Sequence, residues 1–137
     1  MLPEMIRVRR EGNIFEVEAS DLVPGDIMLL YEGNKVPADG RLLKCNGLKV
    51  DSSSLTGESE PIKLSTTSTH ENMIESKNMV FSGSLINSGD GEVLVCYTGM
   101  STQIGKIVQL TKDVSGKFDI IYLFDIIMHD VSFKCFF

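Results

Sequence analysis

The chain of 137 residues has no tryptophan, only two histidines and only three cysteines. The cysteines show no Cys-x-x-Cys spacing, and His70 in a polar stretch offers too few ligands for a zinc site. No stretch reaches the roughly 20 apolar residues that a membrane helix needs, and the N-terminus does not resemble a signal peptide. We therefore expect a soluble chain with no metal ligands and no bound cofactor of its own.

Positive charge is also scarce, because 13 basic residues face 19 acidic ones and the formal net charge is −6. The basic residues gather only at Arg7, Arg9 and Arg10, which alternate with apolar Ile6 and Val8 as on the solvated face of a strand. A nucleic-acid-binding protein needs a broader basic patch. We therefore expect no nucleic-acid partner.

Short runs of alternating apolar and polar residues dominate the first half of the chain, separated by turn residues. Glu11-Gly12-Asn13 predicts a hairpin between strands at 6–10 and 14–18. Further strands are predicted at 27–31, 41–44 and 48–51, with a turn at Asn46-Gly47 between the last two. In the second half, strands are predicted at 78–81, 84–87 and 92–98, and the segments 52–59 and 65–77 are predicted to be loops.

The apolar period changes near the end of the regular pattern. Ile104, Ile107 and Val108 lie on one face of a helix predicted at 102–110, with Ser101 or Thr102 as the N-cap. Many short strands and one C-terminal helix predict a mainly β fold, of the β-sandwich or distorted jelly-roll kind.

The segment with the clearest chemical content is 50–61 (VDSSSLTGESEP), where a predicted strand leads into a loop of small polar residues. Gly57 allows close approach of the backbone to a partner, Thr56 and Ser59 supply hydroxyls, and Glu58 can orient or deprotonate a water molecule. Taken as four isolated residues, this segment is more often a simple polar turn.

Five ordered motifs give the segment a context: 21–26 (DLVPGD), 36–41 (VPADGR), 51–61 (DSSSLTGESEP), 78–84 (NMVFSGS), and YTG at 97–99 followed by TQIGKI at 102–107. With these motifs the chain resembles the actuator domain of type II P-type cation-transporting ATPases. The resemblance covers 3–111, which we take as the domain. It implies a distorted jelly-roll actuator fold with a short C-terminal helix.

The resemblance also implies a function. In these pumps another domain forms an aspartyl phosphate from ATP with Mg²⁺, and the actuator brings its Thr-Gly-Glu-Ser loop to that group. Carried over, Glu58 activates the hydrolytic water, while Thr56, Gly57 and Ser59 provide loop geometry and contact. Asp26, Pro37, Asp39 and Gly40 also match the family, but turn formation explains them without chemistry.

The implied partners are the phosphorylation domain, the nucleotide-binding domain and the membrane helices of the same pump, on the cytosolic face of a membrane. The chain has no Asp-Lys-Thr-Gly motif and no nucleotide-binding segment. We therefore expect it to be inactive alone. Residues 112–137 do not resemble the family's third membrane helix, which indicates a truncated or misassembled gene model.

The pump type stays open between two readings. Segments 69–72 and 75–78 look most like the sodium/potassium and proton/potassium pumps, whereas 81–84 and 103–107 look closer to calcium pumps. The first reading is preferred and the calcium pump is the alternative. Two other classes remain: a free-standing regulatory module without catalysis, and a soluble hydrolase using Glu58, for which His70 and His129 offer no triad context.

Overall fold

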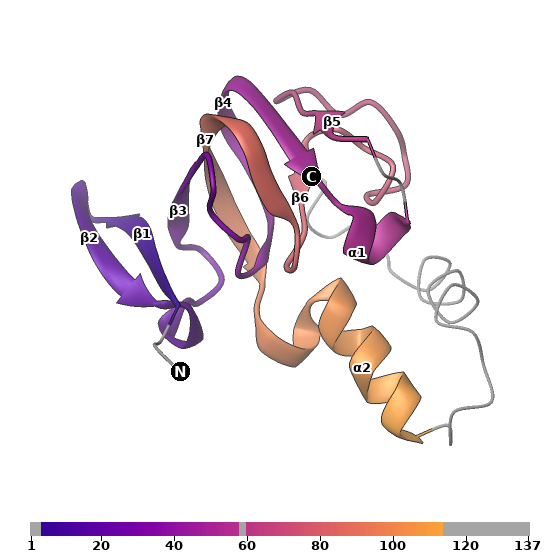
Figure 1. Ribbon diagram of the computed structural model, residues 1–137. Coiled ribbons are helices and arrows are strands. Elements are labelled where there is room, and N and C mark those ends of the chain that lie inside the picture. Colours follow the sequence, from indigo (N-terminus) through magenta and orange to yellow (C-terminus); the bar gives the residue numbers. More distant parts are fainter. Residues whose placement is uncertain (1–3, 58–59, 114–137) are drawn as a thin grey trace.

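The computed structural model describes residues 4–57 and 60–113 (Figure 1). Strands and helices follow one another along the chain in the order β1 Met5–Arg10, β2 Asn13–Glu18, η1 Ala19–Asp21, β3 Ile27–Tyr31, β4 Asp39–Asp51, α1 Ser53–Thr56, β5 Ile62–Lys63, β6 Met79–Val80, β7 Leu85–Tyr97, η2 Gly99–Ser101 and α2 Gln103–Asp113. The mainly antiparallel β fold with a C-terminal helix is thus as predicted. No helix in the described ranges has the length and apolar character to cross a membrane.

Among the described residues, seven strands form one hydrogen-bonded sheet in the order β2-β1-β3-β7-β4-β5, and β6 pairs with β4 beside this path. Every described pairing is antiparallel. The predicted hairpin is confirmed, since Arg10 pairs with Asn13 across a turn of Glu11 and Gly12, both at positive φ. Strand β3 coincides residue for residue with the predicted strand.

The prediction of short strands on either side of Asn46-Gly47 was wrong. A single strand, β4, runs from Asp39 to Asp51 beside β7, which also replaces the two strands predicted around 88–91. Gly47 has a φ of 60° but sits in an irregularity of the ladder, where a Cβ on Gly89 would lie 2.4 Å from the Gly47 carbonyl oxygen. The dipeptide therefore bulges the strand against its partner and does not reverse the chain.

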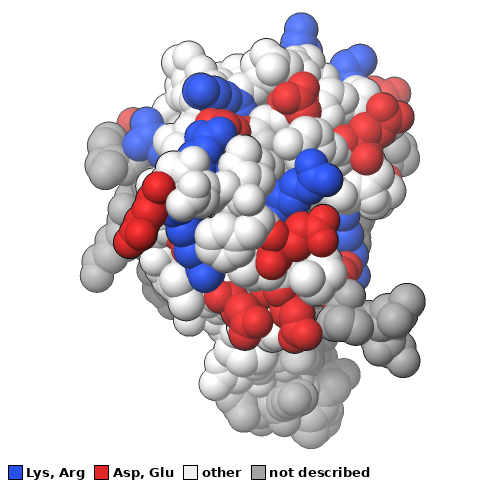
Figure 2. All heavy atoms as spheres, turned by 90° about the vertical axis from the view of Figure 1, so that its left-hand side faces the viewer, with Lys and Arg blue, Asp and Glu red and all other residues white. Residues whose placement is uncertain are grey.

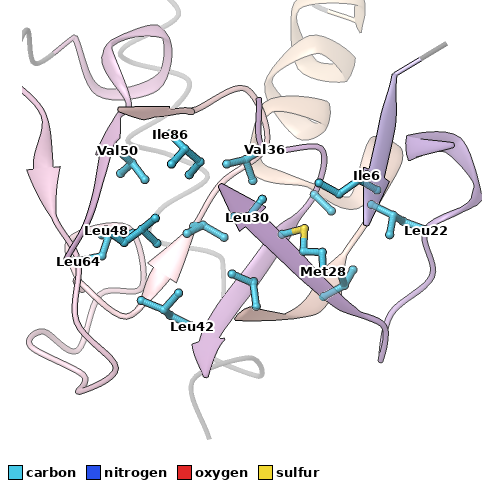
Figure 3. Close-up of a cluster of buried hydrophobic side chains, with 14 of the residues drawn as sticks. Ile6, Leu22, Met28, Leu30, Val36, Leu42, Leu48, Val50, Leu64 and Ile86 are labelled. Carbon is cyan, nitrogen blue, oxygen red and sulfur yellow. The ribbon is translucent and has the colours of Figure 1, made fainter. Parts of the chain in front are cut away.

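The main core is the interior enclosed by the bent sheet. Figure 3 shows side chains from β1, β3, β4 and the following segments pointing into this one interior. Its members are Ile6, Val8, Leu22, Met28, Leu30, Val36, Ala38, Leu42, Leu48, Val50, Leu64, Val80, Ile86, Val93 and Val95. Buried and exposed side chains alternate at the start of β1, whereas in β3 Met28, Leu29 and Leu30 are all buried.

Acidic and basic side chains are interspersed on the side of the molecule nearest β2 and β1 (Figure 2). Arg7 pairs with Glu16 across the hairpin at 3.7 Å, and both side chains are exposed. Arg9 instead pairs with Glu92 of β7, and the two side chains are only 32% and 16% exposed. The three arginines predicted to form a simple solvated face thus differ, since Arg9 and Arg10 are half-buried and ion-paired.

Helix α2 begins at Gln103, one residue after the predicted start, and continues to Asp113, three residues beyond the predicted end. The hydroxyl of Thr102 accepts a hydrogen bond from the N–H of Gly105 at 3.0 Å and donates one to the carbonyl of Gly99 at 2.7 Å. Thr102 is therefore the N-cap, one of the two predicted residues. Residues 114–137, which include His129 and most of the predicted tail, lie outside the described residues.

Candidate functional site

The segment singled out by its chemistry begins with one helical turn, α1, and not with an irregular loop. The Asp51 carboxylate accepts a hydrogen bond from the N–H of Ser53 at 2.9 Å and so satisfies one free donor at the start of the turn. Hydrogen bonds from Ser53 hold the pKa of Asp51 below its ordinary value. A four-residue helix has no apolar period, which is why the sequence predicted only a loop here.

Gly57 ends this turn in the left-handed region, with φ 75° and ψ −2°. Its N–H donates to the carbonyl of Ser53 at 3.0 Å, which closes the turn. Thr56 is the last residue of α1. Glu58 and Ser59, the other two predicted site residues, lie outside the described residues. The described part of the site therefore consists of the turn that leads directly to Glu58.

Strand β4 holds the segment at both ends. The segment leaves β4 after Asp51 and returns as β5, whose Ile62 pairs with Val50. Beyond β5, Leu64 donates its N–H to the carbonyl of Leu48 at 2.9 Å. The two ends of the 52–61 segment are therefore fixed side by side on one strand.

Two buried hydroxyls join the base of this loop to the neighbouring segment. The Oγ atoms of Ser52 and Ser84 lie 3.4 Å apart, and both residues are buried. Ser84 also donates its N–H to the carbonyl of Phe81 at 3.2 Å. The motif at 78–84, which the sequence placed among strands, thus lies directly beside the base of the loop that carries the Thr-Gly-Glu-Ser residues.

A second, smaller hydrophobic cluster lies against α1. Its buried members are Met73, Met79 and Phe81, and the half-buried side chains of Leu55, Ile74 and Tyr97 pack on it. Leu55 comes from α1 itself, so a side chain adjacent in sequence to Thr56 is tied to the body of the domain. Nothing in the sequence pattern indicated this cluster, because its members come from separate segments.

Asp39, which turn formation explained at the sequence level, is in fact fully buried at the start of β4. One carboxylate oxygen accepts the N–H of Ser82 and the other accepts the N–H of Gln103, each at 2.8 Å. Burial raises the pKa of Asp39 to about 6, although the two hydrogen bonds and the charge of Lys106 act in the opposite direction. Asp39 therefore joins β4, the 81–84 segment and α2.

Asp26 also does more than form a turn. Its carboxylate accepts the N–H of Val23 at 3.1 Å, as a turn predicts, and also binds Arg10 through two hydrogen bonds of 2.8 and 2.6 Å. The Arg10 guanidinium holds the pKa of Asp26 below its usual range. Pro37 lies just before β4 and Gly40 is its second residue, so the matched residues at 36–41 span the start of this strand around Asp39.

Within 4–57 and 60–113, no group of three or more His, Cys, Asp or Glu side chains is arranged to hold a metal ion. His70 is exposed, as predicted, and its Nε2 lies 2.9 Å from a carboxylate oxygen of Glu75. A surface hollow of about 350 Å³ lies by β1 and β3 among residues that include Met5, Arg7 and Tyr31. It is lined by a different part of the chain from the 52–61 loop.

Comparisons with known proteins agree on one family. The family model of the P-type ATPase actuator domain matches residues 1–112. The chain is 38% identical over 133 residues to the sodium/potassium-transporting ATPase subunit alpha of Hydra vulgaris, covering 96% of this chain and 13% of that protein. It is also 38% identical over 117 residues to the potassium-transporting ATPase alpha chain 1 of Xenopus laevis, covering 85% of this chain and 11% of that protein.

Solved structures show the same relationship in three dimensions. A zinc-transporting PIB-type ATPase in its E2.Pi state superimposes with a TM-score of 0.66 at 26% identity, over 85% of this chain and 18% of the other. A second structure of a zinc-transporting PIB-type ATPase, in a different state, gives a TM-score of 0.67 at 26% identity, over 87% of this chain and 18% of the other. With its sheet, C-terminal helix and ordered motifs all in agreement, the chain belongs to the actuator domains of P-type ATPases.

Proposed function

We propose that the chain is the actuator of an ATP-driven cation pump, in which its Thr56-Gly57-Glu58-Ser59 loop promotes hydrolysis of the aspartyl-phosphate intermediate. The observation that carries the proposal is that the 52–61 segment is fixed on β4 at both ends, with Gly57 in the left-handed region directly before Glu58. The chain spans only 13% and 11% of the length of its two relatives. The pump's activity is therefore proposed for the longer protein.

Hydrolysis of the aspartyl phosphate requires few chemical groups from the loop. An acyl phosphate is already activated, so its hydrolysis requires chiefly an in-line water molecule, neutralisation of charge and exclusion of other nucleophiles. A single carboxylate placed beside the phosphorus can orient and deprotonate that water. We assign this role to Glu58, with Gly57 allowing close backbone approach and the hydroxyls of Thr56 and Ser59 contacting the partner site.

The partners follow from the same chemistry. The phosphorylated aspartate would come from the phosphorylation domain of the same pump, since this chain has no Asp-Lys-Thr-Gly motif. ATP and Mg²⁺ would be held by that domain and the nucleotide-binding domain. The actuator would act on the cytosolic face of the membrane that holds the transport helices.

The transported ion is proposed to be an alkali cation. Both relatives are named as pumps of this kind, one for sodium and potassium and one for potassium. The structural neighbours are named as zinc-transporting, so likeness of fold is not used to choose the cation. Measuring which cation stimulates phosphorylation and dephosphorylation in the pump that carries this domain separates the alkali-cation reading from the calcium alternative.

Glu58→Gln in the full-length pump tests the catalytic role. General-base assistance is typically worth about 10²- to 10⁴-fold in rate, so we expect decay of the phosphoenzyme to slow within that range while its formation continues. Glu60→Gln, an exposed carboxylate two positions away in the same loop, is the matched control and should leave decay unchanged. A normal decay rate in the Glu58 variant would remove the proposed function.

A further inference from the structure

We infer that Leu55 is the positioning residue of the Thr56–Ser59 loop, and that the cluster of Met73, Met79 and Phe81 is the seat into which it fits. The inference rests on the proposed function, because it explains how the domain would hold Glu58 at a defined place. It concerns residues that carry no chemistry and lie outside the catalytic loop.

The turn that precedes Glu58 cannot hold itself in place. Helix α1 has only four residues, and a helix of that length is unstable without tertiary contacts because one turn repays little of its ordering entropy. Its local hydrogen bonds are those of the Ser53, Leu55 and Gly57 N–H groups, which fix the shape of the turn. The Ser52–Ser84 hydroxyl contact holds the base of the loop, but it lies before the first residue of α1 and leaves the far end of the turn to be held by packing.

Packing of the Leu55 side chain fixes the distance between α1 and the sheet. Ser53, two positions earlier on the same turn, is exposed, whereas Leu55 is half-buried and packs on the second cluster. This cluster is distinct from the main core, and its described buried members are three large side chains. Because packed side chains fill their space densely, a large apolar side chain seated there has few alternative positions.

The cluster that contacts Leu55 is held in place by three other parts of the domain. Met79 belongs to β6, where it pairs with Arg41 of β4. Met73 lies in a turn closed by hydrogen bonds from the N–H groups of Glu75 and Ser76 to the carbonyl of Asn72, at 3.1 and 3.0 Å. A shift of the sheet or of the 72–76 turn is therefore transmitted to Leu55.

The third part that holds the cluster is the end of β7, which contacts helix α2. Tyr97, at the end of β7, packs on the cluster, and the ammonium group of Lys106 lies 5.6 Å from the centre of its ring. This places α2, the last described element, in contact with the same group of side chains that seats the loop.

The expected consequence is a selective kinetic defect. A displacement of about 1 Å in a group that must meet a reacting centre can cost about 10²-fold in rate. Loosening Leu55 should therefore slow the step that uses the loop, which is decay of the phosphoenzyme. Formation of the phosphoenzyme takes place in other domains and should change little.

The test compares four variants in the full-length pump, with rates of phosphoenzyme formation and decay measured separately. Leu55→Ala should slow decay by about tenfold or more and leave formation within about twofold of wild type. Leu55→Met keeps the volume and fits a methionine-rich seat, so it should restore most of the decay rate. Leu43→Ala, an exposed leucine of β4 outside the cluster, is the matched control and should behave as wild type.

Glu58→Gln is the fourth variant and separates the two proposals. If phosphoenzyme decay is slow in Glu58→Gln but normal in Leu55→Ala, the positioning role of Leu55 is refuted and the proposed function stands. If the phosphoenzyme of Glu58→Gln decays at the normal rate, the proposed function is refuted, and the inference about Leu55 that rests on it is refuted too. A Leu55→Ala variant that loses formation and decay equally, without rescue by methionine, shows general damage and also overturns the inference.

A second measurement uses the chain itself and does not depend on pumping. Backbone ¹⁵N relaxation gives order parameters of about 0.85 for rigid residues and below about 0.6 for flexible ones. We expect the Leu55 and Gly57 amides to fall from the rigid toward the flexible range in Leu55→Ala, while those of β3 do not change. Equal order parameters in both proteins would show that the cluster does not hold the loop.

Discussion

The carboxylate of Asp39 accepts a hydrogen bond of 2.8 Å from the backbone N–H of Gln103, 64 positions later in the chain. Gln103 is the first residue of α2, so the contact ties the start of the helix to the start of β4. The other carboxylate oxygen accepts the N–H of Ser82 at 2.8 Å. An ionised carboxylate at a helix N-terminus is favourable for the helix dipole, but this one is also fully buried.

Burial of Asp39 raises its pKa more than its hydrogen bonds and Lys106 lower it, which predicts a distinctive dependence of stability on pH. The pKa of Asp39 is about 6 in the folded protein against an ordinary value of 3.8, because burial disfavours the charge. Between these values the folded state binds more protons than the unfolded state, so stability falls as pH rises through this window. A pKa difference of one corresponds to about 1.4 kcal/mol, which gives a loss of about 3 kcal/mol above a pH of about 6.

Asp39→Asn should remove this contribution. We expect the free energy of unfolding of the wild type to fall relative to that of the variant by about 2 kcal/mol between about pH 4 and about pH 7, which is most of the full loss. Urea denaturation at a series of pH values measures it. Glu32→Gln, an exposed acid in a turn, is the control and should leave the pH dependence of the wild type unchanged. Parallel curves for wild type and Asp39→Asn would show that the charge of Asp39 is not linked to folding.

For the stability of the domain itself, Gly57 is predicted to be needed for its backbone conformation and not for space. A Cβ at this position would meet nothing within 4 Å, but φ is 75°. Left-handed backbone costs an L-residue with a Cβ roughly 1–2 kcal/mol, and asparagine tolerates it better than alanine. Thermal denaturation should therefore rank wild type above Gly57→Asn and Gly57→Asn above Gly57→Ala. The same stability for all three would mean that the turn relaxes to another conformation.

Two adjacent leucines of β4 offer a matched test of the core. Leu42 is 1% exposed and belongs to the main cluster, whereas Leu43 is 42% exposed on the opposite side of the strand. Leu42→Ala should cost roughly 2–5 kcal/mol of unfolding free energy through lost burial and a cavity. Leu43→Ala should change it by about 0.5 kcal/mol or less. Similar losses for both variants would contradict the register of β4 against β7.

Features encoded by neighbouring residues were predicted well from the sequence. The hairpin at Glu11-Gly12, strand β3 and the Thr102 cap depend on turn preferences, alternation and a hydroxyl that reaches its own helix. The residue types of the 50–61 segment also singled it out, although the loop predicted at 52–59 begins with the helical turn α1. The role of Glu58 in that loop stays a prediction, because Glu58 lies outside the described residues.

Features that depend on distant partners were predicted wrongly or were not predicted. Asn46-Gly47 has the composition of a hairpin turn, and only the presence of β7 alongside makes it a bulge within β4. Asp39 has the composition of a turn residue, and only the packing of α2 and the 81–84 segment buries it. Leu55 gave no signal, because the other members of its cluster begin at Met73, in a separate segment of the chain.

The sequence by itself determined the family, the mainly β class, the helix start and the residues proposed to act on a phosphoenzyme. These properties depend on residue identity and short spacing, which folding does not alter. The tertiary structure alone decided which polar residues are buried, which turn residues stay within a strand, and what packs against the turn before Glu58. Burial and packing depend on segments brought together from across the chain, so only the folded arrangement brings Leu55 to its cluster and Asp39 to helix α2.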